Sequence, residues 1–135
     1  MPLKLEIVTP EASIFSDEVD IVVLPGSIGE MGVLPNHAPL VTTLQPGELT
    51  YTKDGSTTEL AVGEGLVEVG PNGVNIATDM AIHGEEIDEA AVEAALQRAK
   101  DALAEKTNAE EVAAVEAAIA KSLAQLKLKR KRRNV

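Results

Sequence analysis

The residues of this sequence that could do chemistry are three spaced glycines, two histidines, an acidic run and a basic end. Gly26, Gly29 and Gly32 superficially resemble a phosphate-binding loop. Such a loop needs a helix start behind it, and usually a Lys-Ser or Lys-Thr pair. Val-Leu-Pro-Asn-His follows instead and indicates no helix, so we expect no phosphate site here.

Neither histidine has the surroundings of a metal ligand or a catalytic base. His37 and His83 are the only two, and neither stands at ligand spacing from another histidine or from a cysteine, which the chain lacks. The acidic run Asp17, Glu18 and Asp20 lacks the spacing and turn glycine of a calcium loop. No serine, histidine and acid share a nucleophile context. The sequence therefore predicts no metal, no cofactor and no catalytic residue.

The chain ends on six cations within nine residues and no acid: Lys127, Lys129, Arg130, Lys131, Arg132 and Arg133. Cations near a helix C-terminus complement its dipole by roughly a few tenths of a kcal/mol each, and six exceed that need. The net charge of −10 divides into −10 for residues 1–84, −6 for 85–126 and +6 for 127–135. The remaining −16 would repel nucleic acid. An acidic protein segment or anionic lipid headgroups fit this basic end better.

Length and composition limit the number of domains, the kind of core and the location of the protein. A chain of 135 residues makes one domain, or one domain with an appendage. Phe15 and Tyr51 are its only aromatic residues, so the core must be aliphatic and base stacking has little support. No window reaches the roughly 18 apolar residues of a membrane span, and the N-terminus carries no apolar signal-peptide run, which favours the cytoplasm.

The first part of the chain has the patterns of short strands. Apolar and polar residues alternate at Leu3, Leu5 and Ile7, and again at Val19, Ile21 and Val23. Residues 47–62 indicate a hairpin on Asp54-Gly55, and residues 65–78 indicate another on Pro71-Asn72-Gly73. Strands and turns at this spacing are typical of a β-sandwich or a barrel.

After Gly84 the composition changes to that of helices, without glycine or proline. Asp88 is a suitable N-cap for a helix to about Glu105, with Val92, Leu96, Ala99 and Leu103 on one stripe. Residues 107–110 match a capping box, and the second helix repeats the stripe at Val112, Val115, Ile119, Leu123 and Leu126. We expect a β domain over 1–84 and an antiparallel helical hairpin over 85–135. Its many alanines predict only marginal stability by itself.

Several segments together resemble the epsilon subunits of bacterial F-type (rotary) ATP synthases, over essentially the whole chain. The most specific is Gly-Glu-Met-Gly-Val-Leu-Pro-Asn-His-Ala-Pro-Leu at 29–40. The others are residues 8–11 leading to Phe15-Ser16, 45–47, 66–69, 87–88 and 124–126. The resemblance implies an all-β sandwich of about ten short strands followed by the helical hairpin.

The resemblance also implies a non-catalytic rotor subunit of the central stalk, coupling proton flow through the c-ring to ATP synthesis. Its partners would be the gamma subunit, the c-subunit ring and the alpha/beta catalytic head, at the cytoplasmic face of the bacterial inner membrane and peripheral to it. Glu30-Met31 matches a turn that faces the polar loops of the c-ring, and the loop through His37 helps to form the same end of the sandwich.

In this family the hairpin lies folded on the sandwich or extends along gamma, where its basic end meets acidic segments and blocks hydrolysis. The six cations at 127–133 fit that inhibitory role. Some members bind ATP through Ile/Leu-Asp-x-x-Arg-Ala. Here Ile87, Asp88 and Arg98 match, but Ala91 replaces the motif arginine. Losing one charge-assisted contact costs about 1.5–3 kcal/mol, so we expect ATP binding to be weak or absent.

Two other functions fit parts of the pattern. A stand-alone β-sandwich adaptor would dock its basic helix on an acidic protein or a lipid surface. A nucleic-acid binder would use the tail alone. Co-purification with gamma and the c-ring distinguishes the rotor subunit from the adaptor, and a salt-sensitive shift of labelled RNA or DNA would favour the third function.

Overall fold

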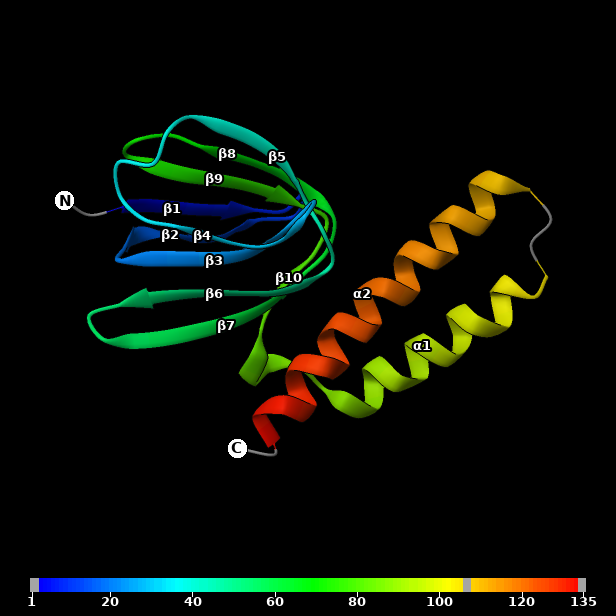
Figure 1. Cartoon of the computed structure of the whole chain (residues 1–135). Helices are drawn as coiled ribbons and strands as arrows, with labels where there is room; N and C mark the ends of the chain where they lie inside the picture. The colour runs from blue at the N-terminus through cyan, green and yellow to red at the C-terminus, as the bar shows by residue number, and fades with distance from the viewer. Residues whose placement is uncertain (1–2, 106–107, 134–135) are drawn as a thin grey trace.

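A computed structural model describes residues 3–105 and 108–133, apart from the side chain of residue 133. An all-β sandwich precedes an antiparallel helical hairpin, which confirms the expected fold class (Figure 1). The strands are β1 (Leu3–Val8), β2 (Ser13–Val19), β3 (Ile21–Gly26), β4 (Gly29–Val33), β5 (Leu40–Leu44), β6 (Gly47–Lys53), β7 (Ser56–Val62), β8 (Gly65–Val69), β9 (Gly73–Thr78) and β10 (Ala81–His83). A 3-10 turn, η1 (Gly84–Glu86), leads to α1 (Glu89–Leu103) and α2 (Ala109–Arg133).

The strands form one hydrogen-bonded sheet that folds over on itself (Figure 1). Its order is β10-β7-β6-β3-β5-β8-β9-β1-β2, with β4 paired to β3 outside this path. Among the described strands only β1 and β9 run parallel, and every other pair is antiparallel. Folding the sheet brings the inner faces of β1, β8 and β9 against those of β3, β6 and β7, and this gives the aliphatic core.

Alternation identified β1 correctly, because Leu3, Leu5 and Ile7 are all fully buried. The second alternating run predicted that Val19, Ile21 and Val23 share one face, and this was wrong beyond Val19. The chain bends at Asp20, whose N–H donates to the carbonyl of Thr52 (2.7 Å), and β3 then starts on the opposite face. Val22 and Leu24 therefore enter the core. A period-two pattern in the sequence does not reveal a bend between two strands, although such a bend changes which residues face the core.

Both expected hairpins are confirmed as β6–β7 and β8–β9. In the first, Asp54 has φ 50° and Gly55 has φ 82°. Two consecutive positive φ angles are the requirement of the two-residue turn whose twist matches that of the flanking strands. This turn fixes the register in which Glu48 lies opposite Ala61 and Thr50 opposite Glu59.

The helices begin at side-chain caps. Asp88 caps α1 as expected, since its Oδ1 accepts from the N–H of Ala91 (3.2 Å). The second cap is Asn108, whose Oδ1 accepts from the N–H of Glu111 (2.8 Å). The expected capping box began at Thr107, which lies outside the described residues. None of the described helices is long and apolar enough to cross a membrane.

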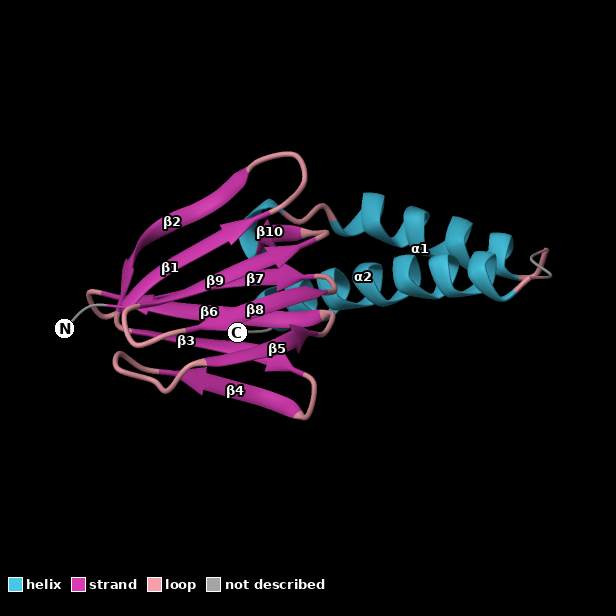
Figure 2. Ribbon diagram, turned by 90° about the horizontal axis from the view of Figure 1, so that it is seen from above, coloured by secondary structure: helices cyan, strands magenta, loops and turns pink. Residues whose placement is uncertain are grey.

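The hairpin is attached to the sandwich mainly through the end of α2. Helix α1 buries no residue fully, and the C-terminal end of α1 and the N-terminal end of α2 lie away from the strands (Figures 1 and 2). In α2, Leu126 and Leu128 are buried, whereas Leu123 of the expected apolar stripe is 49% exposed. Earlier in α2, Lys121 Nζ pairs with Asp79 Oδ2 (3.5 Å) and Gln125 donates to Met80 Sδ (2.9 Å). The half of α2 from Lys121 onward thus carries the contact, and the rest of the hairpin projects from it.

Candidate functional site

The glycine- and proline-rich segment forms the β3–β4 hairpin and the connection that follows it. Its turn holds Gly29 at φ 124° and exposes Ile28 completely. Residues 29–33 are a strand, so no helix N-terminus follows the glycines as a phosphate loop requires. Glu30 and Met31 lie within β4 and not in the turn itself, which corrects the expected placement.

Glu30 and His37 lie at opposite ends of the sandwich, which corrects the expectation of a single shared end. Glu30 is beside the β3–β4 turn, on the side where α2 lies. His37 is in the connection from β4 to β5, where Asn36 donates its N–H to the carbonyl of Pro71 in the β8–β9 turn (2.8 Å). The five residues of β4 rise about 3.3 Å each, so they separate these ends by about 13 Å.

The basic end of α2 folds back against acidic residues of the same chain. Arg130 Nε lies 2.9 Å from Glu89 Oε1, and the same guanidinium pairs with Glu93, both on α1. The remaining pairs reach the sandwich and are Lys131 Nζ with Glu48 Oε1 (2.9 Å) and Glu59 Oε2 (3.4 Å), and Arg132 Nη1 with Glu59 Oε1 (3.0 Å).

The other three cations of the tail differ from these. Lys127 and Lys129 form no ion pair with any of the described residues. The side chain of Arg133 is not among those described. The tail is therefore not one uniform cationic tip but contains a paired segment, 130–132.

An apolar contact lies beneath these charges. Leu128 is 1% exposed and packs with Ala61 of β7 and Ile87 of the η1–α1 connection. Gly84 allows the helix to come this close, because a Cβ there would lie 2.6 Å from Arg132 Cδ and 3.4 Å from Leu128 Cδ2. We call Glu48, Glu59, Ala61, Gly84 and Ile87 the docking surface.

The sequence analysis did not identify Glu48 and Glu59 as partners of the tail, although the predicted hairpin could have placed them side by side. The β6–β7 hairpin was expected, and its register sets Glu48 opposite Ala61, two residues from Glu59. These two carboxylates are therefore diagonal neighbours on one face. Like charges this close favour a cation between them, and Lys131 contacts both.

The paired charges of the docking surface and the tail shift the pKa values of Glu59 and Lys131. The pKa of Glu59 is lowered, first by its hydrogen bond with Glu48 and further by Lys131 and Arg132, against the opposing effect of burial. The pKa of Lys131 is raised, mainly by its hydrogen bond to Glu48. Both shifts favour the charged forms that pair in the docked helix.

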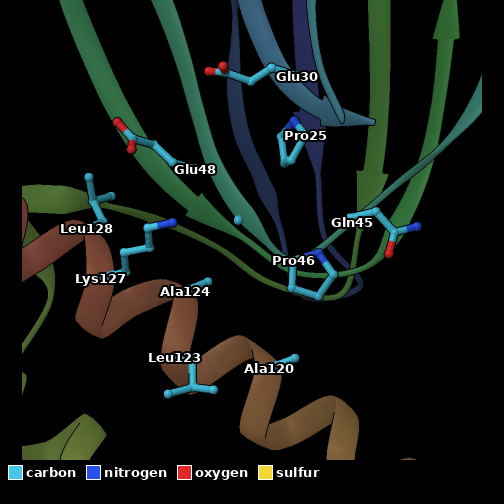
Figure 3. A pocket seen from close by; sticks show the side chains of 11 residues that line it. Pro25, Glu30, Gln45, Pro46, Glu48, Ala120, Leu123, Ala124, Lys127 and Leu128 are labelled. Carbon is cyan, nitrogen blue, oxygen red and sulfur yellow. The ribbon is translucent and has the colours of Figure 1, made fainter. Parts of the chain in front are cut away.

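An open groove lies between one side of α2 and the sandwich (Figure 3). Its volume is about 660 Å³, with Pro25, Glu30 and Pro46 on the strand side. Leu123 and Lys127 line the helix side. Side chains do not fill this space, so α2 is not packed along its length as core helices are.

The three residues of the degenerate nucleotide motif do not converge. Ile87 is buried in the docking surface, and Asp88 is occupied in capping α1. Arg98 is exposed ten residues further along, about 15 Å at 1.5 Å per residue. Among the described residues, no group of three or more His, Asp or Glu side chains could hold a metal ion.

Comparison with known proteins assigns this architecture to a family. Residues 2–84 match the family described as ATP synthase, Delta/Epsilon chain, beta-sandwich domain, and residues 85–130 match ATP synthase, Delta/Epsilon chain, long alpha-helix domain. The chain belongs to the ATP synthase delta/epsilon chain family. The resemblance noted in the sequence is thereby confirmed.

Relatives match nearly the whole chain. The ATP synthase epsilon chain of Herpetosiphon aurantiacus is 42% identical over 134 residues, 99% of this chain and 98% of the relative. That of Dehalococcoides mccartyi strain CBDB1 is 46% identical over 132 residues, 97% and 94% of the two chains.

Solved structures share the fold. A chain in the cryo-EM structure of the Euglena gracilis mitochondrial ATP synthase, OSCP/F1/c-ring, matches with TM-score 0.75 and 26% identity, covering 93% of this chain and 79% of that one. A chain of the Tetrahymena thermophila mitochondrial ATP synthase central stalk/c-ring shares the fold at 12% identity and TM-score 0.55, covering 64% and 69%.

The docked helix end predicts a pH effect of known sign. The docked pKa of Glu59 lies below its ordinary value of 4.5, so its contribution to docking is complete above about pH 4.5 and is lost as pH falls through the docked pKa. Replacing the partner cations, K131Q/R132Q, should raise the pKa of Glu59. A carboxyl carbon NMR titration measures it, with K127Q/K129Q as the control that should leave it unchanged. An equal shift in both variants would contradict the pairing.

Proposed function

We propose that the chain is a non-catalytic rotor subunit in the central stalk of an F-type ATP synthase, helping to couple proton flow through the c-ring to ATP synthesis. The observation that carries this proposal is family membership over both parts of the chain. It is supported by the similarity to a chain of the Euglena OSCP/F1/c-ring assembly. The described residues also offer contact surfaces rather than a convergent set of acid, base and nucleophile.

In this proposal the two parts of the chain divide the work. The sandwich, 1–84, would bind the gamma subunit and the c-ring, and the helices, 85–135, would regulate hydrolysis at the alpha/beta head. The assembly would lie at the cytoplasmic face of the bacterial inner membrane, with this chain peripheral to it. The paired segment 130–132 argues against a stand-alone adaptor with a permanently free basic helix, because those cations are occupied within the chain.

The opposite placement of Glu30 and His37 divides the proposed rotor contact in two. We assign the Glu30 end to the c-ring, following the match of Glu30-Met31 to the ring-facing segment. The His37 end, where Leu34 is 58% exposed, would then face another subunit.

One experiment tests both assembly and regulation. Membranes that carry the full chain or the chain without residues 127–135 are solubilised and purified through a tag on this subunit. Gamma, the catalytic subunits and the c-ring should co-purify equally with both forms, because the sandwich is unchanged. ATP hydrolysis should rise several-fold without the tail, since the inhibitory cations are gone. Failure of the full chain to recover gamma would refute the rotor assignment, and equal hydrolysis rates would refute inhibition by the tail.

Single cysteines can test the two ends, since the chain has no native cysteine. We expect E30C to crosslink to the c-subunit in the assembled complex and H37C to crosslink to a different subunit. Thr57→Cys, on an exposed part of β7, provides a control for random labelling. Crosslinks from both E30C and H37C to the c-subunit would contradict the separation of the two ends.

A further inference from the structure

Three of the described strands, β2, β4 and β10, have a neighbouring strand on one side only. Unpaired strand edges attract further strands, and most proteins protect them. In β2, Asp17 Oδ1 accepts from the N–H of Glu18 (2.8 Å), and the same carboxylate pairs with Lys53. Strand β10 has only three residues. Strand β4 has neither protection, and Figure 2 shows it at the border of the sandwich.

Pro25 determines which backbone groups of β4 are free. It lies opposite Glu30 and has no N–H, and its carbonyl accepts from the N–H of Gln45 (2.8 Å) instead of from β4. Opposite residues of an antiparallel pair alternate between bonded and non-bonded. Pro25–Glu30 and Val23–Gly32 are therefore the non-bonded pairs. The N–H and C=O groups of Glu30 and Gly32 thus point away from β3, and no described residue bonds them. We call these groups the open edge.

The side chains beside the open edge leave room for another strand. A Cβ added to Gly32 would meet no atom within 4 Å, so the space over this residue is empty. Glu30 is exposed and forms no ion pair with any described residue. Met31, on the other face, packs against the core and is only partly covered. An added strand would meet a carboxylate, a methionine and a notch left by glycine.

The charge of this edge distinguishes between the strands that could add to it. A second copy of the chain would bring together two molecules of net charge −10 and set the exposed carboxylates of two β4 strands beside each other. Like charges on opposite residues of two strands are destabilising, and opposite charges are stabilising. A strand with a lysine or arginine opposite Glu30 is therefore favoured over a second copy.

We propose that the open edge of β4 binds an extended basic segment of a partner protein, which adds to the sheet as an antiparallel strand. Main-chain hydrogen bonds to Glu30 and Gly32 supply the affinity, and the side chains of the segment supply the specificity. Its cation lies opposite Glu30, its apolar residue beside Met31, and its aromatic residue over Gly32, because aromatic side chains cover glycines at a sheet edge. Along the partner the pattern reads aromatic, apolar, basic. The inference names the chemistry of the segment and does not depend on the rotor assignment.

The isolated full chain can be titrated with the acetylated and amidated peptide Thr-Tyr-Val-Lys-Thr, and the amide signals followed by NMR. Binding should shift the amides of Glu30 and Gly32 and slow their hydrogen exchange, because these N–H groups acquire acceptors. The amides of Met31 and Val33 belong to the bonded pairs with β3 and should gain little protection.

Two modified peptides test whether the main chain makes the contact. In the proposed register the tyrosine N–H donates to the carbonyl of Gly32, whereas the valine N–H points away from β4. N-methylation of the tyrosine should therefore weaken binding about tenfold, as expected for a lost hydrogen bond and a steric clash. N-methylation of the valine should leave the affinity unchanged. This comparison requires no change in the protein.

Two pairs of variants test the same contact from the side of the chain. G32P removes a free N–H without breaking a bond to β3, whereas G32A keeps it and adds a methyl group in open space. G32P should bind the peptide about tenfold more weakly than G32A. E30Q should weaken binding about two- to fivefold, as expected for a cross-strand charge pair. The control E68Q, on the exposed side of β8, should not.

Each contrary result has a definite meaning. Equal affinity for the two methylated peptides, or no shift at Glu30 and Gly32 with millimolar peptide, would overturn the inference. Shifts of these amides that grow with chain concentration, without peptide, would show that a second copy occupies the edge, and would overturn the proposed occupant. None of these assays needs another subunit, so such results leave the rotor assignment standing. A chain that recovers no gamma from membranes would refute only that assignment.

Discussion

The arrangement of both helices depends on the burial of Leu128 against Ala61 and Ile87. Burying one leucine contributes about 1.5–3 kcal/mol, and each exposed ion pair around it adds about 0–1 kcal/mol. The sandwich core, by contrast, contains sixteen buried residues from nearly every strand. The two parts of the chain therefore differ greatly in how firmly they are held, and the hairpin is the part that can change position without unfolding the rest.

Local patterns in the sequence were sufficient for most of the elements. Alternation located β1, the Asp54-Gly55 turn fixed the β6–β7 hairpin, and Asp88 marked the start of α1. These features depend on neighbours within a few residues. The bend at Asp20 reversed the buried face of β3, because its partner Thr52 is 32 positions away.

The site was harder to predict for the same reason. The six cations were evident, but Lys131 is separated from Glu48 by 83 positions, and only the folded chain brings them together. Charge totals suggested two poles of opposite sign. The structure instead lays the basic end on the acidic sandwich, which lowers the repulsion within each part. The separation of Glu30 from His37 also could not be predicted from the sequence alone. The short segment between them could have formed a turn that keeps them together, but it forms strand β4, which places them at opposite ends.

These features together describe a well-packed sandwich with a helical hairpin attached to it at one side. The sandwich presents two separate ends, and the groove leaves one side of α2 free of tight packing. The attachment combines apolar burial with exposed ion pairs, which salt screens. In the proposed function, the sandwich would make the rotor contact and the helices would regulate, so the two roles would lie on parts of the chain that are held separately.

The most direct test of this account follows the two parts separately during thermal unfolding. Tyr51 is the only tyrosine, is 8% exposed and lies in the sandwich core, while ellipticity at about 222 nm reports mainly on the helices. Leu128→Ala should lower the helical transition by roughly 5–10 °C, as expected for about 1–2 kcal/mol in a unit of this kind, and leave the Tyr51 transition unchanged. Leu123→Ala, at the half-exposed position, should move neither. Coincident helical and Tyr51 transitions that shift together in Leu128→Ala would contradict the account.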